Sequence, residues 1–163
     1  MHPTAGCSSE RQRECGASLV EFALLVPVLF FVMFAIIELG VMFWVNLTMQ
    51  HAVREGVRYA VTGQSDLDPD TKNRQRYRAV IQKVKDSSMG LYERVDPAIS
   101  LNHGTPMRDP ARFSPGMFGG PGDIMVLQLD CNWPIVTPLL QPFFTDGKYH
   151  FSVAATMRNE EFR

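Results

Sequence analysis

The longest apolar stretch of the chain lies near its N-terminus. Between Phe22 and Trp44 the only charged residue is Glu38. These 23 residues can form a helix that crosses a bilayer core, which needs about 20. A secretory signal peptide has a shorter apolar core followed by a small-residue cleavage site, and none follows Trp44. The pattern therefore predicts a retained transmembrane helix. The alternative, a buried helix of a soluble core, would need protein on every face of the helix.

Beyond Asn46 the pattern stays helical but becomes amphipathic. Apolar residues repeat at intervals of three or four positions, at Met49, Val53, Val57 and Ala60. This spacing marks one face of a helix. We therefore expect a single helix from Ser18 to Val61, in which the first half suits lipid and the second half suits a folded domain.

A second amphipathic helix is predicted from Pro69 to Ser88. Its expected buried stripe consists of Tyr77, Val80, Ile81 and Val84. Six Lys and Arg residues between Lys72 and Lys85 make this helix basic. We expect them to form a solvated face; binding of anionic lipid or of an acidic partner is the alternative.

In the second half of the chain the apolar period changes to two. Alternation over 94–102, 123–133 and 148–158 predicts three strands of an antiparallel sheet with one covered face. The residues expected on that face are Val95, Ile99 and Leu101, then Met125, Leu127, Leu129, Cys131 and Trp133, and finally Tyr149, Phe151, Val153, Ala155 and Met157. The predicted fold class is α+β, with a long irregular loop at 104–122 that is rich in Pro and Gly.

The segment at 134–147, between the last two predicted strands, is apolar yet broken by prolines. We expect it to pack over one end of the sheet. The alternative is a hydrophobic contact with a partner protein or with the bilayer surface. The residues concerned are Ile135, Leu139, Leu140, Phe143 and Phe144.

The net charge and the residues that could bind a metal or act in catalysis exclude several classes of function. The net charge of −1 over 163 residues gives no sign of nucleic-acid binding. Cys7, Cys15 and Cys131 form no CxxC pair and no metal-binding spacing, and the histidines stand alone. Motifs of serine hydrolases, zinc proteases and P-loop enzymes are absent from the sequence. We therefore predict no enzymatic activity, no metal, no cofactor and no small-molecule substrate.

The apolar helix is preceded by a glycine and a small residue, Gly16 and Ala17, and has a carboxylate, Glu21, at its start. The stretches "GASLVEFALLVPVLFFVMFAIIELG", "AVREGVRYAV" and "ATMRNEEF" resemble the TadE-like proteins. These are minor pilins, or pseudopilins, of the tight-adherence (Tad/Flp) type IV pilus system. The similarity is dense over 16–61 and returns at 155–162.

The resemblance implies that a prepilin peptidase cuts between Gly16 and Ala17 on the cytoplasmic side. Residues 1–16 would then be a leader, 17–45 a transmembrane helix, and 46–163 a periplasmic pilin-like α+β domain. Glu21 would become the fifth residue of the mature chain. In pilins this carboxylate pairs with the new N-terminal amine of a neighbouring subunit. Phe22 stands where major Flp pilins usually carry Tyr, which points to a minor pilin.

Both carboxylates of the apolar run have alternative roles. Glu21 could merely complement the helix dipole, an effect worth about 0.3–1 kcal/mol, although a carboxylate near a bilayer usually has a partner. Glu38 lies near the far end of the run, where it could reach lipid headgroups or contact another helix.

The resemblance therefore predicts a non-catalytic minor pilin that assists Tad pilus assembly and so supports adhesion. It would be a single-pass protein of the bacterial inner membrane, with its N-terminus in the cytoplasm and the possibility of entering the pilus. Its partners would be the prepilin peptidase, other Tad pilins and the secretion platform. The alternatives are an uncleaved single-pass protein with a periplasmic binding domain and a membrane-tethered enzyme. The charges flanking the helix do not set its orientation.

Overall fold

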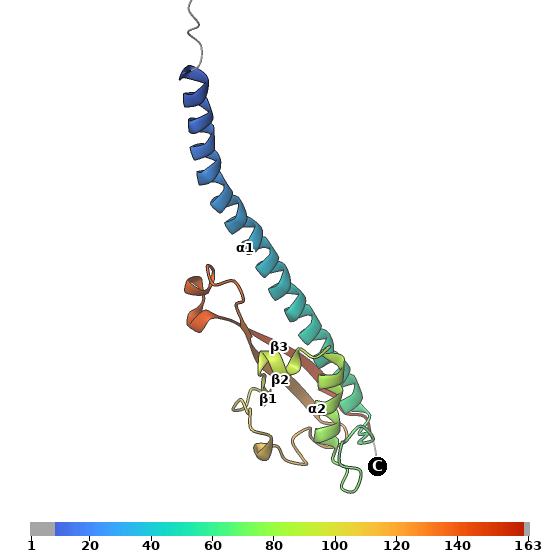
Figure 1. Cartoon of the computed structure of the whole chain (residues 1–163). Helices are drawn as coiled ribbons and strands as arrows, with labels where there is room; N and C mark the ends of the chain where they lie inside the picture. The colour runs from blue at the N-terminus through green and yellow to red at the C-terminus, as the bar shows by residue number, and fades with distance from the viewer. Residues whose placement is uncertain (1–8, 162–163) are drawn as a thin grey trace, which may run out of the picture. The chain divides into compact units, whose positions relative to one another are not determined.

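The computed structural model describes residues 9–161, with side chains from residue 19 onward. The elements are α1 (Ser9–Val61), α2 (Arg76–Ser87), α3 (Tyr92–Val95), β1 (Ala98–Leu101), η1 (Pro110–Arg112), β2 (Ile124–Pro134), η2 (Gln141–Phe143), η3 (Thr145–Gly147) and β3 (Lys148–Arg158) (Figure 1). A long apolar helix, further helices and an antiparallel sheet confirm the predicted α+β class. Residues 1–8 of the expected leader, and Phe162 of the C-terminal motif, lie outside the described residues.

The chain divides into two compact units, Met1–Leu39 and Gly40–Arg163. The boundary falls within α1, so that one helix contributes to both units. We call the second unit, Gly40–Arg163, the head.

Helix α1 begins at Ser9 and not at the predicted Ser18. The added residues contain good helix formers and no proline, so nothing before Gly16 stops the helix. In the head the predicted apolar stripe of α1 is confirmed. Its four members, each at most 8% exposed, are Met49, Val53, Val57 and Ala60.

Helix α2 begins at Arg76 and not at the predicted Pro69. The preceding residues form turns, because the Asp68 carboxylate accepts hydrogen bonds from the backbone N–H groups of Asp70 and Gln75. Such local side-chain bonds compete with helix formation. The predicted stripe of α2 is confirmed. Val80 and Val84 are fully buried, and Tyr77 and Ile81 pack against the core from partly buried positions.

Gly56 allows α2 to approach α1 closely. A Cβ atom at this position would lie 2.3 Å from Cγ2 of Val84, which is far inside van der Waals contact. The apolar stripes of α1 and α2 thereby join one hydrophobic core.

The sheet has the antiparallel order β1-β2-β3, and Leu129 of β2 lies opposite Ile99 of β1 and Val153 of β3. The predicted covered face of β2 is confirmed, since all five of its residues are at most 8% exposed: Met125, Leu127, Leu129, Cys131 and Trp133. On β3 the predicted residues are buried or half-buried, while their neighbours are exposed.

The first predicted strand begins later than expected. Val95 is buried as predicted, but it ends α3, and β1 starts only at Ala98. Asp96 between them has a φ of 42°, in the left-handed region, so the chain turns there before it becomes extended.

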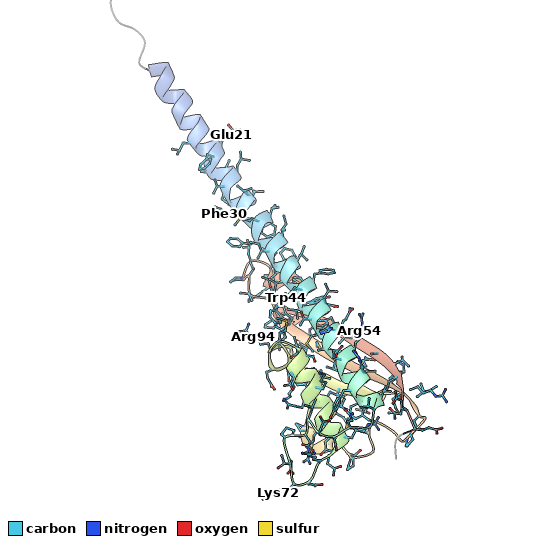
Figure 2. The ribbon with its side chains drawn as sticks, turned by 90° about the vertical axis from the view of Figure 1, so that its right-hand side faces the viewer. Glu21, Phe30, Trp44, Arg54, Lys72 and Arg94 are labelled. Carbon is cyan, nitrogen blue, oxygen red and sulfur yellow. The ribbon has the colours of Figure 1, made fainter. Side chains whose placement is uncertain are left out.

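The two ends of the sheet lie at opposite ends of the head's part of α1. Beyond the end of β3, the Glu160 N–H donates to the Val61 carbonyl (3.1 Å), which places this end of the sheet at the C-terminus of α1. The opposite end, where β2 and β3 are joined, is about 33 Å away for strands of 11 residues. The segment joining the two strands, 135–147, accordingly lies at the end of the head where α1 carries Trp44 (Figures 1 and 2).

Candidate functional site

The first unit exposes apolar side chains on every face of α1. Leu19, Phe22 and Leu24 are each about 70% exposed, and most large hydrophobic residues as far as Leu39 are also exposed (Figure 2). A helix that is apolar all round is stable in lipid or surrounded by other helices, not in water. Among the described residues, α1 is the one helix long and apolar enough to cross a membrane, which supports membrane anchoring.

Glu21 is the one charged residue between Leu19 and Ile37. Its side chain is exposed, as is the ring of the adjacent Phe22, which lines a shallow apolar surface with Leu25 and Leu29. A carboxylate at such a position is costly in lipid unless a cation or donor meets it. The Glu21 carboxylate is therefore accessible to the surroundings of the helix, beside an apolar surface.

The predicted processing residues, Gly16 and Ala17, belong to the helical backbone of α1. Their side chains lie outside the part of the chain whose side chains the structure describes. Cleavage at this position stays a prediction.

Glu38 differs from Glu21 in its surroundings. It is only 5% exposed and is not without a partner. Its carboxylate is therefore not a free charge on the helix surface, and its contact with another helix or with headgroups stays a prediction.

The β2–β3 loop, which we define as residues 135–147, divides the predicted contact residues into two sets. Ile135 is 3% exposed, and Leu140 and Phe144 are partly buried against the core, as expected for packing over one end of the sheet. In contrast, Leu139 is 59% exposed and Phe143 is 75% exposed. One side of the loop therefore covers the end of the sheet, and the other side exposes apolar side chains to the surroundings.

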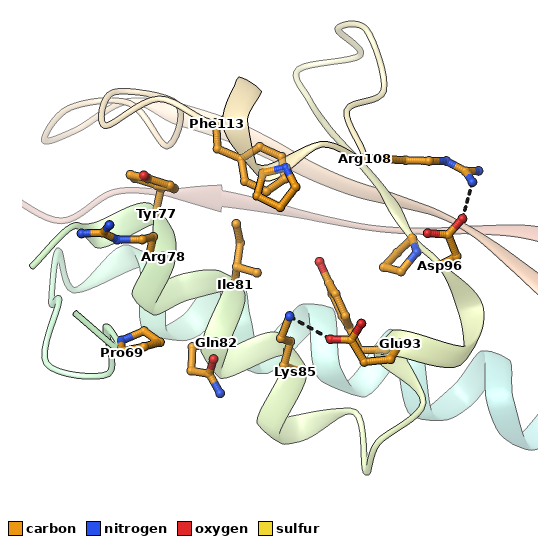
Figure 3. Close-up of a pocket in the computed structure, with 13 residues that line it drawn as sticks. Pro69, Tyr77, Arg78, Ile81, Gln82, Lys85, Glu93, Asp96, Arg108 and Phe113 are labelled. Atoms are coloured by element: carbon orange, nitrogen blue, oxygen red, sulfur yellow. Dashed lines mark hydrogen bonds and ion pairs between the residues drawn. The ribbon is translucent and has the colours of Figure 1, made fainter.

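A cleft of about 320 Å³ lies on the head between α2, α3 and the loop that contains η1 (Figure 3). Its walls include Tyr77 and Ile81 of α2, Tyr92 of α3 and Phe113. Burial, reinforced by the nearby charge of Glu93, raises the pKa of Tyr92, so this phenol stays protonated.

The three cations that line the cleft are paired with carboxylates. Lys85 lies 2.8 Å from Glu93, Arg78 lies 2.9 Å from Asp68, and Arg108 pairs with Asp96. The cleft thus combines apolar walls with a rim of neutralised charge, and it fits an apolar group of a partner better than an ion.

The sequence pattern gave no signal of the cleft, and it predicted the wrong surroundings for one basic residue of α2. Arg76 was expected on a solvated face, but its guanidinium group is partly buried and donates to the carbonyls of Ala60 and Gly119. It also donates to Oδ1 of Asn159 at 2.7 Å. Burial lowers the pKa of Arg76 from its usual value, although an arginine remains charged. No local pattern signals these partners, because they lie 16, 43 and 83 residues away.

Asn159 connects the C-terminal motif to the core. It is 3% exposed, and its side-chain amide donates to the carbonyls of Phe118 and Gly120, each at 2.8 Å. The quoted motif "ATMRNEEF" therefore has a structural role at the end of α1, where Arg76 and Asn159 hold three segments together.

Asn159→Ala should lower the free energy of unfolding of the head by about 1–3 kcal/mol, because it leaves the buried Phe118 carbonyl without its donor and removes one acceptor of the Arg76 guanidinium group. The measurement is thermal unfolding of the full chain in detergent, followed by near-ultraviolet circular dichroism. Asn132→Ala is the matched control, since Asn132 makes an exposed contact with His150. Equal midpoints for the two variants would contradict the assigned role of Asn159.

Residues suited to catalysis or metal binding do not converge in the described part of the chain. No group of three or more His, Cys, Asp or Glu that could hold a metal occurs among these residues. Cys131 is buried as predicted, and burial, with a smaller contribution from Asp130, raises the pKa of its thiol to about 12. A thiol with this pKa stays protonated and is a poor nucleophile.

Comparison with known proteins gives one match. No curated protein and no solved structure matches the chain. Residues 16–58 match the family model described as TadE-like protein. This range contains Gly16, Ala17, Glu21 and the apolar turns of α1. Residues 16–58 are therefore similar to the TadE-like proteins, as the sequence pattern predicted.

Proposed function

We propose that the protein is a non-catalytic minor pilin, or pseudopilin, that takes part in assembly of a Tad (Flp) pilus and so supports adhesion. The observation that carries this proposal is the exposed apolar part of α1 with a single carboxylate at its start, inside the segment that matches the TadE-like family. Such a helix can reside in the inner membrane and later pack against the same helices of other pilins. The head then faces the periplasm, and the N-terminus faces the cytoplasm.

The proposal gives Glu21 a partner. Cleavage after Gly16 creates an α-amino group at Ala17, with an ordinary pKa of about 7.7–8.0. At neutral pH much of this amine is charged, and it can pair with the exposed Glu21 carboxylate of a neighbouring subunit. Pairing lowers the cost of holding both charges within an apolar helix bundle. Phe22 adds an exposed ring beside this contact.

The proposal assigns the remaining partners to other chains. The prepilin peptidase reads the region around Gly16, the secretion platform receives the processed protein, and other Tad pilins contact α1. The apolar walls and neutralised rim of the cleft suit a protein contact, and the proposed function requires no cofactor or small-molecule substrate.

Gly16→Leu should block processing, because a bulky side chain replaces the small residue directly before the cut. The expected result is accumulation of a membrane-bound protein that retains residues 1–16 and migrates more slowly on a gel. Intact mass spectrometry of protein extracted from membranes checks the assignment.

Gly40→Leu is the matched control for this variant. Gly40 lies in the same helix, and an added Cβ there meets no atom within 4 Å. This variant should be processed as the parent is. A mature mass for Gly16→Leu that shows loss of the leader would overturn the proposed cleavage.

A further inference from the structure

We propose that the β2–β3 loop is a second membrane contact, which inserts Leu139 and Phe143 into the lipid interface at the end of the head where α1 carries Trp44. This inference rests on the proposed function in one respect, namely that α1 crosses a membrane. The occupant of this surface is the phospholipid bilayer itself.

Exposed apolar side chains are concentrated in the β2–β3 loop. Three of the large hydrophobic residues that are exposed outside α1 lie in one eight-residue stretch of this loop: Val136 at 71%, Leu139 at 59% and Phe143 at 75%. Exposed hydrophobic residues that gather in this way mark contact sites, whereas scattered single ones do not.

The structure of the loop holds these side chains outward. The Gln141 side chain donates to the Ile135 carbonyl (3.0 Å), and the Ile135 N–H donates to the Gly147 carbonyl (3.0 Å). Ile135 is buried, and Leu140 and Phe144 pack against the core. The inward positions are thus already occupied, so Leu139 and Phe143 cannot both turn inward without displacing them.

The position of the loop within the head also suits a membrane contact. The loop lies at the end of the sheet opposite Val61, at the same end of the head as Trp44 (Figures 1 and 2). Phe43 is 67% exposed and Trp44 is 48% exposed, and both belong to the head's part of α1. Aromatic residues at the end of an apolar helix are typical of the membrane–water interface. The loop therefore lies near the level at which the bilayer surface is expected.

The tip of the loop carries no charge. No charged residue occurs from Cys131 to Thr145, so insertion of the loop tip needs no ion to leave water. The first cation after the loop is the exposed Lys148, whose long side chain can keep its ammonium group among anionic headgroups. Asp146, which is also exposed, lies between the tip and Lys148, so the two charges behind the tip balance each other. The tip itself is apolar and uncharged, which suits a lipid surface.

The test uses the full chain in vesicles of phosphatidylethanolamine and phosphatidylglycerol. Cys7 and Cys15 are replaced by Ser and Cys131 by Ala, and an environment-sensitive fluorophore is attached to a single introduced cysteine. Phe143→Cys reports on the loop. Ile124→Cys is the matched control, because Ile124 is 65% exposed but lies at the opposite end of the same sheet. Phe30→Cys reports on the apolar part of α1.

Labels at positions 143 and 30 should show blue-shifted emission and strong quenching by lipids that carry a nitroxide on the acyl chain. The label at 124 should show water-like emission and several-fold weaker quenching. A label at 143 that behaves like the one at 124, while position 30 is quenched, overturns the loop contact and leaves the membrane helix in place. A label at 30 that is not quenched overturns the membrane helix and this inference with it.

Introducing a charge into the loop tests whether lipid or another protein contacts it. Leu139→Asp in the chain labelled at 143 should shift the emission to that of water, whereas Met89→Asp, at a 74% exposed position outside the loop, should not. A blue-shifted signal at 143 that nitroxide lipids do not quench, and that rises with protein concentration, would assign the loop to a protein contact and overturn the proposal.

Discussion

Leu129→Asp is expected to unfold the head. Leu129 is 1% exposed, at the centre of the covered face of β2, between Ile99 and Val153 on the neighbouring strands. An aspartate there would place an unpaired charge in the core, at a cost of several kcal/mol. Since domains are commonly stable by only about 5–15 kcal/mol, the variant should lose most of its cooperative unfolding transition. Near-ultraviolet circular dichroism of the full chain during heating, in detergent, measures this loss.

Ala154→Asp provides the control for this change. Ala154 lies on β3 next to Val153 but on the exposed face, so the same charge meets water there. Its midpoint should remain close to that of the parent. If Leu129→Asp also unfolds at the temperature of the parent, the covered face of the sheet is wrongly assigned.

Glu21→Gln is expected to abolish association with other pilins while leaving membrane insertion and processing intact. The amide keeps the shape of the side chain but cannot neutralise the Ala17 amine of a neighbour. An amine held in an apolar bundle without its partner charge is strongly destabilising, by about 3–5 kcal/mol for buried pairs. Crosslinking to other pilins and pilus-dependent adhesion should therefore both fall, at normal protein levels in the membrane.

The helix-dipole alternative predicts a different outcome for the same variant. If Glu21 only complements the N-terminus of α1, its loss costs about 0.3–1 kcal/mol of helix stability and leaves assembly unchanged. Glu55→Gln is the control, because it makes the same change in the head's part of the same helix. Crosslinking and adhesion at parental levels in Glu21→Gln would decide for the dipole role.

The periodic parts of the fold were predictable because burial alone determines them. The four-residue spacing of Met49, Val53 and Val57 gave the buried face of α1, and strict alternation gave the covered face of β2. The start of α2 was not predictable from periodicity, because Asp68 forms turns through hydrogen bonds to Asp70 and Gln75. Val95 satisfied the apolar pattern of a strand, yet the left-handed Asp96 separates it from β1.

The candidate site also has features that the sequence predicts and features that it does not. The apolar helix and the isolated Glu21 are visible in a single stretch of sequence. The Arg76–Asn159 contact and the cleft could not be predicted, because each joins segments far apart in the chain. In the β2–β3 loop the sequence marked the apolar residues, but only the structure separates the buried Ile135 from the exposed Phe143.

The N-terminus of the protein recovered from membranes decides whether this chain is a processed pilin. N-terminal sequencing, with the intact mass as a second readout, identifies the first residue of the mature chain. We expect a mature chain that begins at Ala17, with Glu21 as its fifth residue. A protein that still begins at Met1 would overturn the proposed cleavage and favour an uncleaved single-pass protein.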